Sequence, residues 1–225
     1  MKPYYEHAGV TIFHGDCRDV LPSLSFDVVV TDPPYGVGFH GKSTKHTAAS
    51  GVGYTMFDDC PAYIRDVVVP VVFSLVSAGA RVVLTPGLRN VWLYPEPAAM
   101  GTIFYPSGAG NGRWGFTCSQ PILYYGPDPY LANGLGSRPD SFSSTEPAAP
   151  NGHPCPKPIG TMKWLVTKAS LPGETVVDPF SGSGTTLEAA KNLGRRAIGV
   201  EIEERYCEIA AKRLEQEVLP LEVTA

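Results

Sequence analysis

The stretch ETVVDPFSGSGTTLEAAKNLGRRAIGVE, residues 174–201, decides the fold. Its first residues, 174–177, are mainly apolar and β-branched, and they predict a strand that leads into Asp178. A glycine-rich turn follows, after which 185–193 predicts a helix and 196–200 a second strand. This succession of strand, helix and strand is typical of a doubly wound α/β sheet.

Elements on both sides extend this unit. The apolar run at 26–31 is continuous rather than alternating, which indicates a parallel strand buried on both faces. The other expected elements are strands at 10–13, 81–85 and 120–125, and helices at 62–78 (kinked at Pro70), 159–171 and 203–214. Between about 95 and 156 the chain is rich in Gly, Pro, Ser and Asn, and 137–154 predicts a loop. We therefore expect one α/β domain, 1–225, in which 95–156 is a small irregular insertion.

Composition places the chain among globular proteins of the cytoplasm. With 225 residues, of which 43% are hydrophobic and 18% charged, it can bury a sizeable core. The longest apolar run, 67–76, contains Pro70 and is about half as long as a membrane-spanning helix. The N-terminus lacks the apolar core of a signal peptide. The five cysteines form no C-x-x-C pair, so we expect reduced thiols and no metal site.

Charge is distributed unevenly along the chain. The net charge is −4, which argues against a nucleic-acid partner because Lys and Arg supply most non-specific affinity. However, residues 33–170 carry ten basic and seven acidic side chains between two acidic ends. The middle segment suits a DNA-facing insertion, although solvated surface charge without function explains it equally well.

The glycine-rich turn predicts a nucleotide-like ligand. Gly182 and Gly184 allow the backbone to approach a ligand, and free amide groups at the following helix start favour its polar end. A nicotinamide cofactor is disfavoured, because Leu187 stands where the dinucleotide fingerprint has a third glycine. Glu201, at the end of the next strand, is placed to accept hydrogen bonds from ribose hydroxyls.

Two separated motifs resemble one known family. DPPY at 32–35, together with HPCPKPIGTMKWLVTKASLPGETVVDPFSGSGTTLEAAKNLGRRAIGVEIEERYCEIAAKRL at 153–214, resembles the DNA adenine-N6/cytosine-N4 amino-methyltransferases. The tetrapeptide precedes the glycine-rich turn, which is the motif order of their β class. The resemblance covers about 10–40 and 153–214. It implies a Rossmann-like, S-adenosylmethionine-dependent methyltransferase fold with that molecule as cofactor.

The resemblance also assigns roles by position. It implies that Asp16 contacts the cofactor's adenine and that Glu201 clamps its ribose. The remaining implied cofactor-binding residues are Asp32, Lys157, Pro158, Asp178, Phe180, Ser181, Gly182, Gly184, Thr185, Thr186 and Ile202. Three positions depart from the family pattern: Cys155 often corresponds to Thr, Pro156 to Gln, and Gly36 to Asn. The first two departures affect one edge of the expected cofactor pocket.

Asp32, Pro33, Pro34 and Tyr35 are the expected catalytic residues. The exocyclic amine of a base is a poor nucleophile, because its lone pair is delocalised into the ring. Hydrogen bonds from that amine to the Asp32 carboxylate and the Pro33 carbonyl would aim the lone pair at the methyl donor. The prolines fix φ and remove competing amide donors. Tyr35 would stack on the base, which must be flipped out of the duplex.

A second motif overlaps the first. Residues 36–43 match the phosphate-binding loop G-x-x-x-x-G-K-[ST] literally. Two prolines separate them from the preceding strand, and the residues that follow show no helical periodicity, so we interpret this match as accidental. We expect 36–53 to form a mobile loop over the active site. The DNA-binding candidates are Lys42, Lys45, His46, Arg89, Arg113 and Arg138.

These observations predict a site-specific methyltransferase that acts on the exocyclic amine of a flipped base in double-stranded DNA. Adenine N6 is favoured because Asp leads the tetrapeptide. Cytosine N4, an RNA adenine, a protein glutamine, or a DNA-binding protein without turnover remain alternatives. The expected partners are DNA, a second copy of the chain and a cognate restriction enzyme, with no membrane.

Overall fold

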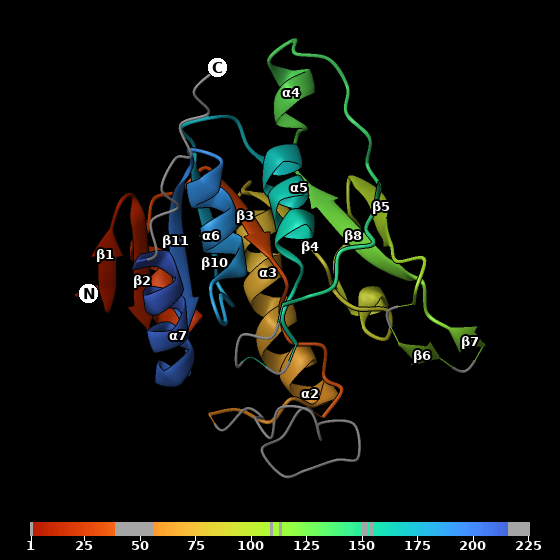
Figure 1. Ribbon diagram of the computed structural model, residues 1–225, viewed down its shortest axis with the longest axis horizontal. Helices are drawn as coiled ribbons and strands as arrows, with labels where there is room; N and C mark the ends of the chain where they lie inside the picture. The colour runs from red at the N-terminus through yellow and green to blue at the C-terminus, as the bar shows by residue number, and fades with distance from the viewer. Residues whose placement is uncertain are drawn as a thin grey trace, which may run out of the picture.

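A nine-stranded mixed sheet forms the centre of the structure (Figure 1). The structure is a computed structural model, and it describes residues 2–38, 56–108, 110–112, 114–149, 153 and 155–215. The strand order is β1-β2-β11-β10-β3-β4-β8-β5-β9. Five adjacent strands of this order are parallel to one another: β2, β11, β10, β3 and β4. The strands are β1 (Tyr5–His7), β2 (Val10–His14), β3 (Val28–Thr31), β4 (Arg81–Leu84), β5 (Ala99–Phe104), β8 (Ser119–Tyr125), β9 (Phe142–Ser143), β10 (Thr175–Asp178) and β11 (Arg196–Glu201). The expected doubly wound, mostly parallel sheet is thus confirmed.

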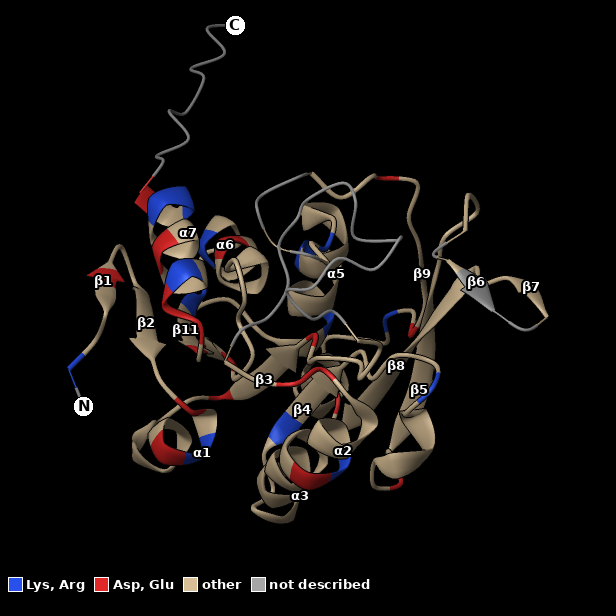
Figure 2. Ribbon diagram, turned by 90° about the horizontal axis from the view of Figure 1, so that it is seen from below, with Lys and Arg blue, Asp and Glu red and all other residues tan. Residues whose placement is uncertain are grey.

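Helices cover both faces of the sheet. Figure 2 shows α5 (Ile159–Ala169), α6 (Thr185–Asn192) and α7 (Glu204–Glu215) on one face. The other face carries α1 (Cys17–Val20), α2 (Pro61–Tyr63) and α3 (Val69–Ser77). The short helix α4 (Pro129–Ala132) and the hairpin of β6 (Asn111–Gly112) and β7 (Gly115–Phe116) lie outside these layers. None of the helices in the described part of the chain is both long and apolar enough to cross a membrane.

The valines of β3 explain why this strand lies at the centre. Val28 and Val30 pack into the core beneath α5, α6 and α7, whereas Val29 points to the opposite face and packs with Ile64 and Val68. All five side chains are fully buried. Burial of a valine contributes roughly 1.5 kcal/mol or more, so a strand that is apolar on both faces is most stable between two helical layers.

The kinked helix has a different form from the one expected. The helical segment begins at Pro61 and contains a π-helical turn, Ile64–Val68, directly before α3. Pro70 has no backbone N–H, so a regular α-helix would leave the carbonyl four residues earlier without its donor. The wider turn accommodates this loss, as single π turns inside helices commonly do.

The segment 95–156 is more regular than its composition predicts. Strands β5 and β8 pair with each other over six residue pairs and extend the main sheet beyond β4. The prediction of a loop at 137–154 is wrong at Phe142–Ser143, which forms β9 beside β5. Gly101 explains why β5 is hard to recognise, because a Cβ there would lie 1.8 Å from the Asp140 carbonyl oxygen. Glycine is needed for this close approach, although it is unfavourable in strands.

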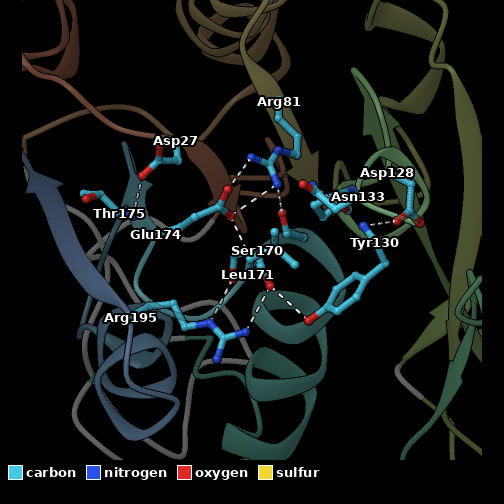
Figure 3. A network of polar contacts seen from close by, with 12 residues as sticks. Asp27, Arg81, Asp128, Tyr130, Asn133, Ser170, Leu171, Glu174, Thr175 and Arg195 are labelled. Atoms are coloured by element: carbon cyan, nitrogen blue, oxygen red, sulfur yellow. Dashed lines mark hydrogen bonds and ion pairs between the residues drawn. The ribbon is translucent and has the colours of Figure 1, made fainter. Parts of the chain in front are cut away.

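Polar side chains join the elements at the N-terminal ends of the parallel strands (Figure 3). Arg81, at the start of β4, donates to the Ala169 carbonyl at 3.0 Å and pairs with Glu174 at 2.9 Å. Arg195 donates to the Ser170 carbonyl at 3.0 Å. The C-terminus of α5 is thereby fixed against three strands.

Candidate active site

The C-terminal ends of β3 and β10 bring the two signature motifs together. The strands are adjacent and parallel, so Asp32, which follows β3, lies beside Asp178, the last residue of β10. The buried Thr31 hydroxyl donates to Asp178 Oδ1 at 2.6 Å and joins the two ends. Parallel α/β sheets bind ligands at such carboxyl ends.

Four side chains donate to the Asp32 carboxylate. Its Oδ1 accepts hydrogen bonds from the hydroxyls of Tyr35 and Thr85, and from Gln120 Nε2 at 3.3 Å. Its Oδ2 lies 2.5 Å from Lys157 Nζ. Burial alone would lower the pKa of Lys157, but the Asp32 carboxylate holds that pKa well above its usual value. Lys157 therefore stays protonated and forms an ion pair with Asp32.

Tyr35 is fixed at both its backbone and its ring. Asn90 Nδ2 donates to its carbonyl at 2.6 Å, and Gln120 Nε2 donates to its hydroxyl. Gly87 leaves room for the ring, since a Cβ at that position would lie 3.0 Å from it. Burial, followed by the nearby Asp32 charge, raises the pKa of Tyr35 well above its ordinary value, so the phenol stays protonated.

Asp59 holds the backbone that follows the tetrapeptide. Its carboxylate accepts from the amides of Gly36 at 2.7 Å, Val37 at 3.2 Å and Gly38 at 3.1 Å. The Asp59 side chain is buried. The positive φ of Gly36, +64°, and the nearby Cys60 backbone explain why a glycine follows Tyr35. The rest of the expected loop over the site, 39–55, lies outside the described residues.

We name the cavity beside the tetrapeptide the cofactor cavity, because several residues expected to bind the cofactor line it. Phe57 and Tyr63 line it together with residues expected to bind the cofactor. Those residues are Asp16, Asp32, Phe180, Gly182, Glu201 and Ile202. The others on the same glycine-rich segment, Asp178, Ser181, Gly184, Thr185 and Thr186, do not line the cavity. Its acidic and aromatic groups suit the hydroxyls and the purine ring of an adenosine moiety.

Glu201 is positioned by backbone amides on two sides of the cavity. Its carboxylate accepts from Gly182 N and from Glu203 N, each at 2.8 Å. Two amide bonds leave further lone pairs for the hydroxyls of a ribose. Burial raises the pKa of Glu201 to about 7, and the nearby Glu203 and Asp178 carboxylates add to this effect.

Asp178 supports the glycine-rich turn from behind. It accepts from the Thr186 hydroxyl at 2.5 Å and from Phe180 N at 3.1 Å, while burial raises its pKa to about 6. Gly184 begins α6 with φ +79°, and a Cβ there would lie 2.8 Å from Ala210 Cβ. This glycine is therefore required for the packing of α6 against α7, as well as for the turn.

Asp16 lies at the other end of the cofactor cavity. It caps α1 by accepting from Arg18 N at 2.9 Å, and it forms an ion pair with the Arg18 side chain at 2.6 Å. The hydrogen bond from Arg18 lowers the pKa of Asp16. Asp16 therefore remains an acceptor of hydrogen bonds at any physiological pH.

His153 is a site residue that the sequence did not identify. Its ring lines the cofactor cavity, stacks edge-on against Tyr206 and approaches Gly182, where a Cβ would lie 3.0 Å from His153 Nε2. Burial lowers the pKa of His153 to about 4, so its ring is neutral. Its place beside Lys157 in the motif HPCPKP was the available signal.

A second cavity of about 460 Å³ adjoins the first. Tyr35 and Cys155 line both, and Gln120 and Lys157 line the second. The rest of its wall comes largely from the segment 95–156, through residues that include Tyr105, Thr117, Ser119, Ser144 and Glu146. The two cavities therefore meet at Tyr35 of the tetrapeptide, and the middle segment forms most of the wall of the second one.

The structure separates some of the residues that the sequence grouped. Lys157 and Pro158 line the second cavity, where Lys157 contacts Asp32, instead of the cofactor cavity. Among the expected DNA contacts, Arg89 also lines the second cavity. Arg138 lies elsewhere and covers the Tyr130 ring at 3.6 Å, near the network of Figure 3. Lys42, Lys45, His46 and Arg113 fall outside the described residues.

Comparisons with known proteins agree with this geometry. A family model described as DNA methylase matches residues 86–212. The type II methyltransferase M2.DpnII of Streptococcus pneumoniae is 46% identical over 250 aligned positions, which cover 96% of this chain and 93% of that protein. The crystal structure of an M1.HpyAVI–SAM complex has a TM-score of 0.64 at 18% identity, over 92% of this chain and 100% of that one. The cytosine-N4-specific PvuII DNA methyltransferase has a TM-score of 0.65 at 16% identity, over 97% and 90%. The chain belongs to the family of S-adenosylmethionine-dependent DNA methylases that modify the exocyclic amine of adenine or cytosine.

Proposed function

We propose that this methyltransferase modifies adenine N6 at a specific sequence in double-stranded DNA. The observation that carries the proposal is the meeting of the two cavities at Tyr35, next to Asp32 in the wall of the first. One cavity suits the cofactor, and the other has room for a base that has been flipped out of the duplex. The segment 95–156, which forms most of the wall of the second cavity, is the region we propose for target recognition.

The residues around the junction have distinct tasks in this reaction. Asp32 accepts a hydrogen bond from the target amine, and the Pro33 carbonyl accepts the other. When bound, the cofactor would supply an electrophilic methyl group, whose bond to the sulfonium sulfur breaks as the amine nitrogen forms its own and leaves a neutral thioether. As the nitrogen lone pair forms the new bond, the amine gives up one proton, for which the Asp32 carboxylate is the adjacent acceptor. Tyr35 stacks on the flipped base, and Lys157 holds the Asp32 carboxylate in place through their ion pair.

Adenine is preferred over cytosine because Asp leads the tetrapeptide at position 32. Cytosine N4 is the second candidate, since the structurally similar PvuII enzyme is cytosine-N4-specific. We further propose that the chain acts in the cytoplasm, in a restriction-modification system with a cognate restriction enzyme. The type II designation of the relatives M2.DpnII and M.ScaI supports this proposal. A homodimer would enlarge its small recognition region.

The test is a labelling experiment with unmethylated DNA. The protein is incubated with isotope-labelled S-adenosylmethionine, and the digested nucleosides are analysed by mass spectrometry. We expect labelled N6-methyladenine from the wild type and none from Asp32→Ala, which should still bind the cofactor. Asp66→Ala is the matched control, because Asp66 pairs with Arg65 on the exposed surface. Labelled N4-methylcytosine in place of N6-methyladenine would show that the target base is cytosine. Equal turnover by Asp32→Ala would remove Asp32 from the mechanism.

A further inference from the structure

The Tyr35 hydroxyl, where the two cavities meet, lies between an acceptor in the wall of the first cavity, Asp32, and a donor in the wall of the second, Gln120. It donates to Asp32 Oδ1 and accepts from Gln120 Nε2. The Gln120 amide also reaches Asp32 Oδ1 directly, at 3.3 Å. An ionised carboxylate only accepts, so the amide group that faces it is the NH2 group. Carboxylate and amide therefore form an adjacent acceptor and donor pair.

This pair is complementary to the edge of an amine-bearing base. In adenine the N6 amine is next to N1, and in cytosine the N4 amine is next to N3, so each base presents a donor beside a ring acceptor. Guanine and thymine present the reverse order at the equivalent edge, a carbonyl acceptor beside a ring N–H. A phenol hydroxyl supplies one donor and one acceptor on a single atom. The Tyr35 hydroxyl thus satisfies the same two groups that such a base would satisfy.

The position of Gln120 allows it to contact a base. It lies near the start of β8, where it is paired with Ile103 of β5, and its side chain is partly exposed to the second cavity. Tyr35 lines the same cavity. A base that enters it would compete with the Tyr35 hydroxyl for the Gln120 amide and the Asp32 carboxylate, so its binding would displace the hydroxyl from both. The displacement would free the Gln120 amide and one acceptor site on Asp32.

We propose that Gln120 is a specificity-determining residue that donates a hydrogen bond to the ring nitrogen beside the target amine, while Asp32 accepts from that amine. The Tyr35 hydroxyl fills this place until the base enters. The inference rests on the proposed function and deepens it. It accounts for selection of adenine and cytosine over guanine and thymine, because the wrong bases would face the amide with a donor and the carboxylate with an acceptor.

The experiment replaces single atoms of the target base. The methylated sequence is first read from DNA of cells that express the wild type. Synthetic duplexes then carry adenine, 1-deazaadenine or 7-deazaadenine at the target position, and kcat/KM is measured for each. If the target is cytosine, 3-deazacytosine takes the place of 1-deazaadenine. The wild type should lose about 10-fold or more on removal of the ring nitrogen, and much less on removal of N7.

Variants of Gln120 distinguish recognition from an altered fold. Gln120→Leu and Gln120→Glu both remove the donor at neutral pH, and the second preserves the shape of the side chain. Both variants should have a lower kcat/KM than the wild type on adenine, and the change from adenine to 1-deazaadenine should lower it little further. Their affinity for the cofactor should stay close to that of the wild type. Ser119→Ala, in the same wall of the cavity, should keep the full wild-type sensitivity to N1.

The outcomes separate the inference from the proposed function. If the wild type and both Gln120 variants lose the same factor on 1-deazaadenine, Gln120 does not contact the ring nitrogen and the inference is overturned, although the enzyme still methylates DNA. If the wild type methylates no DNA at all, the proposed function fails, and the inference fails with it.

Discussion

Lys157 Nζ lies 2.5 Å from Asp32 Oδ2, and the two side chains are only 12% and 17% exposed. The contact joins the tetrapeptide to the segment before α5, and it places a cation directly behind the carboxylate that we assign to the target amine. A buried ion pair contributes little net stability compared with apolar residues, but an isolated buried charge is strongly unfavourable. Replacement of either partner alone should therefore destabilise the fold more than replacement of both together.

Lys157→Met should lower the free energy of unfolding by about 3–5 kcal/mol, because the Asp32 carboxylate remains buried without its cation. Asp32→Asn combined with Lys157→Met should recover much of that loss, and the double variant should still be inactive. Urea unfolding of the three variants measures this coupling. Additive losses in the double variant would show that the two charges do not depend on each other.

The raised pKa of Glu201 predicts a pH-dependent cofactor affinity. Burial raises this pKa from 4.5 to about 7, so the carboxyl group of the free protein is largely protonated at pH 6. Hydrogen bonds from ribose hydroxyls favour the ionised form. Affinity measured by calorimetry should therefore rise between about pH 6 and pH 8 and then level off.

Glu201→Gln is the control for this titration. It should abolish the rise and weaken binding at pH 8 by about 10-fold to 100-fold, which corresponds to the loss of charge-assisted hydrogen bonds. Stability changes in the opposite direction. Because the folded pKa exceeds the unfolded one, the free energy of unfolding of the cofactor-free protein should fall between about pH 4.5 and pH 7. A wild-type affinity that is constant over the range would exclude Glu201 as the ribose ligand.

Alanine substitutions at Gly184 and Gly173 distinguish the cost of backbone strain from the cost of overpacking. The φ angles of these glycines are +79° and +83°, but a Cβ on Gly184 would lie 2.8 Å from Ala210 Cβ, whereas nothing lies within 4 Å of a Cβ on Gly173. Both alanine variants carry the same backbone penalty of about 1–2 kcal/mol. Gly184→Ala should lose about 1–3 kcal/mol more by overpacking, as measured by urea unfolding. Equal losses would mean that α6 and α7 move apart without cost.

The sequence predicted the centre of the fold because local and long-range signals agree there. Continuous apolar runs, a glycine-rich turn and periodic helices define β3, β10, β11, α6 and α7 with correct types and nearly correct ends. Strand β5 was missed because Gly101 serves a contact with Asp140, which no local pattern reveals. The π turn before Pro70 was also beyond a local reading, since the sequence indicated the kink and not its form.

The candidate site was predictable only in its two motifs. Asp32 follows β3, Glu201 ends β11, and both belong to recognisable patterns, so their positions could be inferred. Thr85, directly after β4, and Gln120, in β8, contact Asp32 from positions where a threonine and a glutamine are unremarkable residues. Only the order of strands in the sheet brings them to the carboxylate. The role of Lys157 changed for the same reason, because its direct contact with Asp32 depends on the tertiary fold.

The polar network at the far ends of the strands should contribute to stability without affecting catalysis. Arg81 pairs with Glu174 and donates to the Ala169 carbonyl, and its side chain is 16% exposed. Arg81→Met should lower the free energy of unfolding by about 1–3 kcal/mol, because a largely buried carboxylate and a carbonyl lose their donor. The values of kcat and KM at 25 °C should match those of the wild type, since the active site lies at the opposite ends of the strands.

Arg65→Met is the matched control, because Arg65 is 64% exposed and pairs with the equally accessible Asp66. Solvent screens surface pairs of this kind and they contribute little, so urea unfolding should detect little change. A changed KM in Arg81→Met would mean that the position of α5, and with it the Lys157 segment that precedes it, depends on this distant network. Equal stability losses in the two arginine variants would contradict the structural role of the network itself.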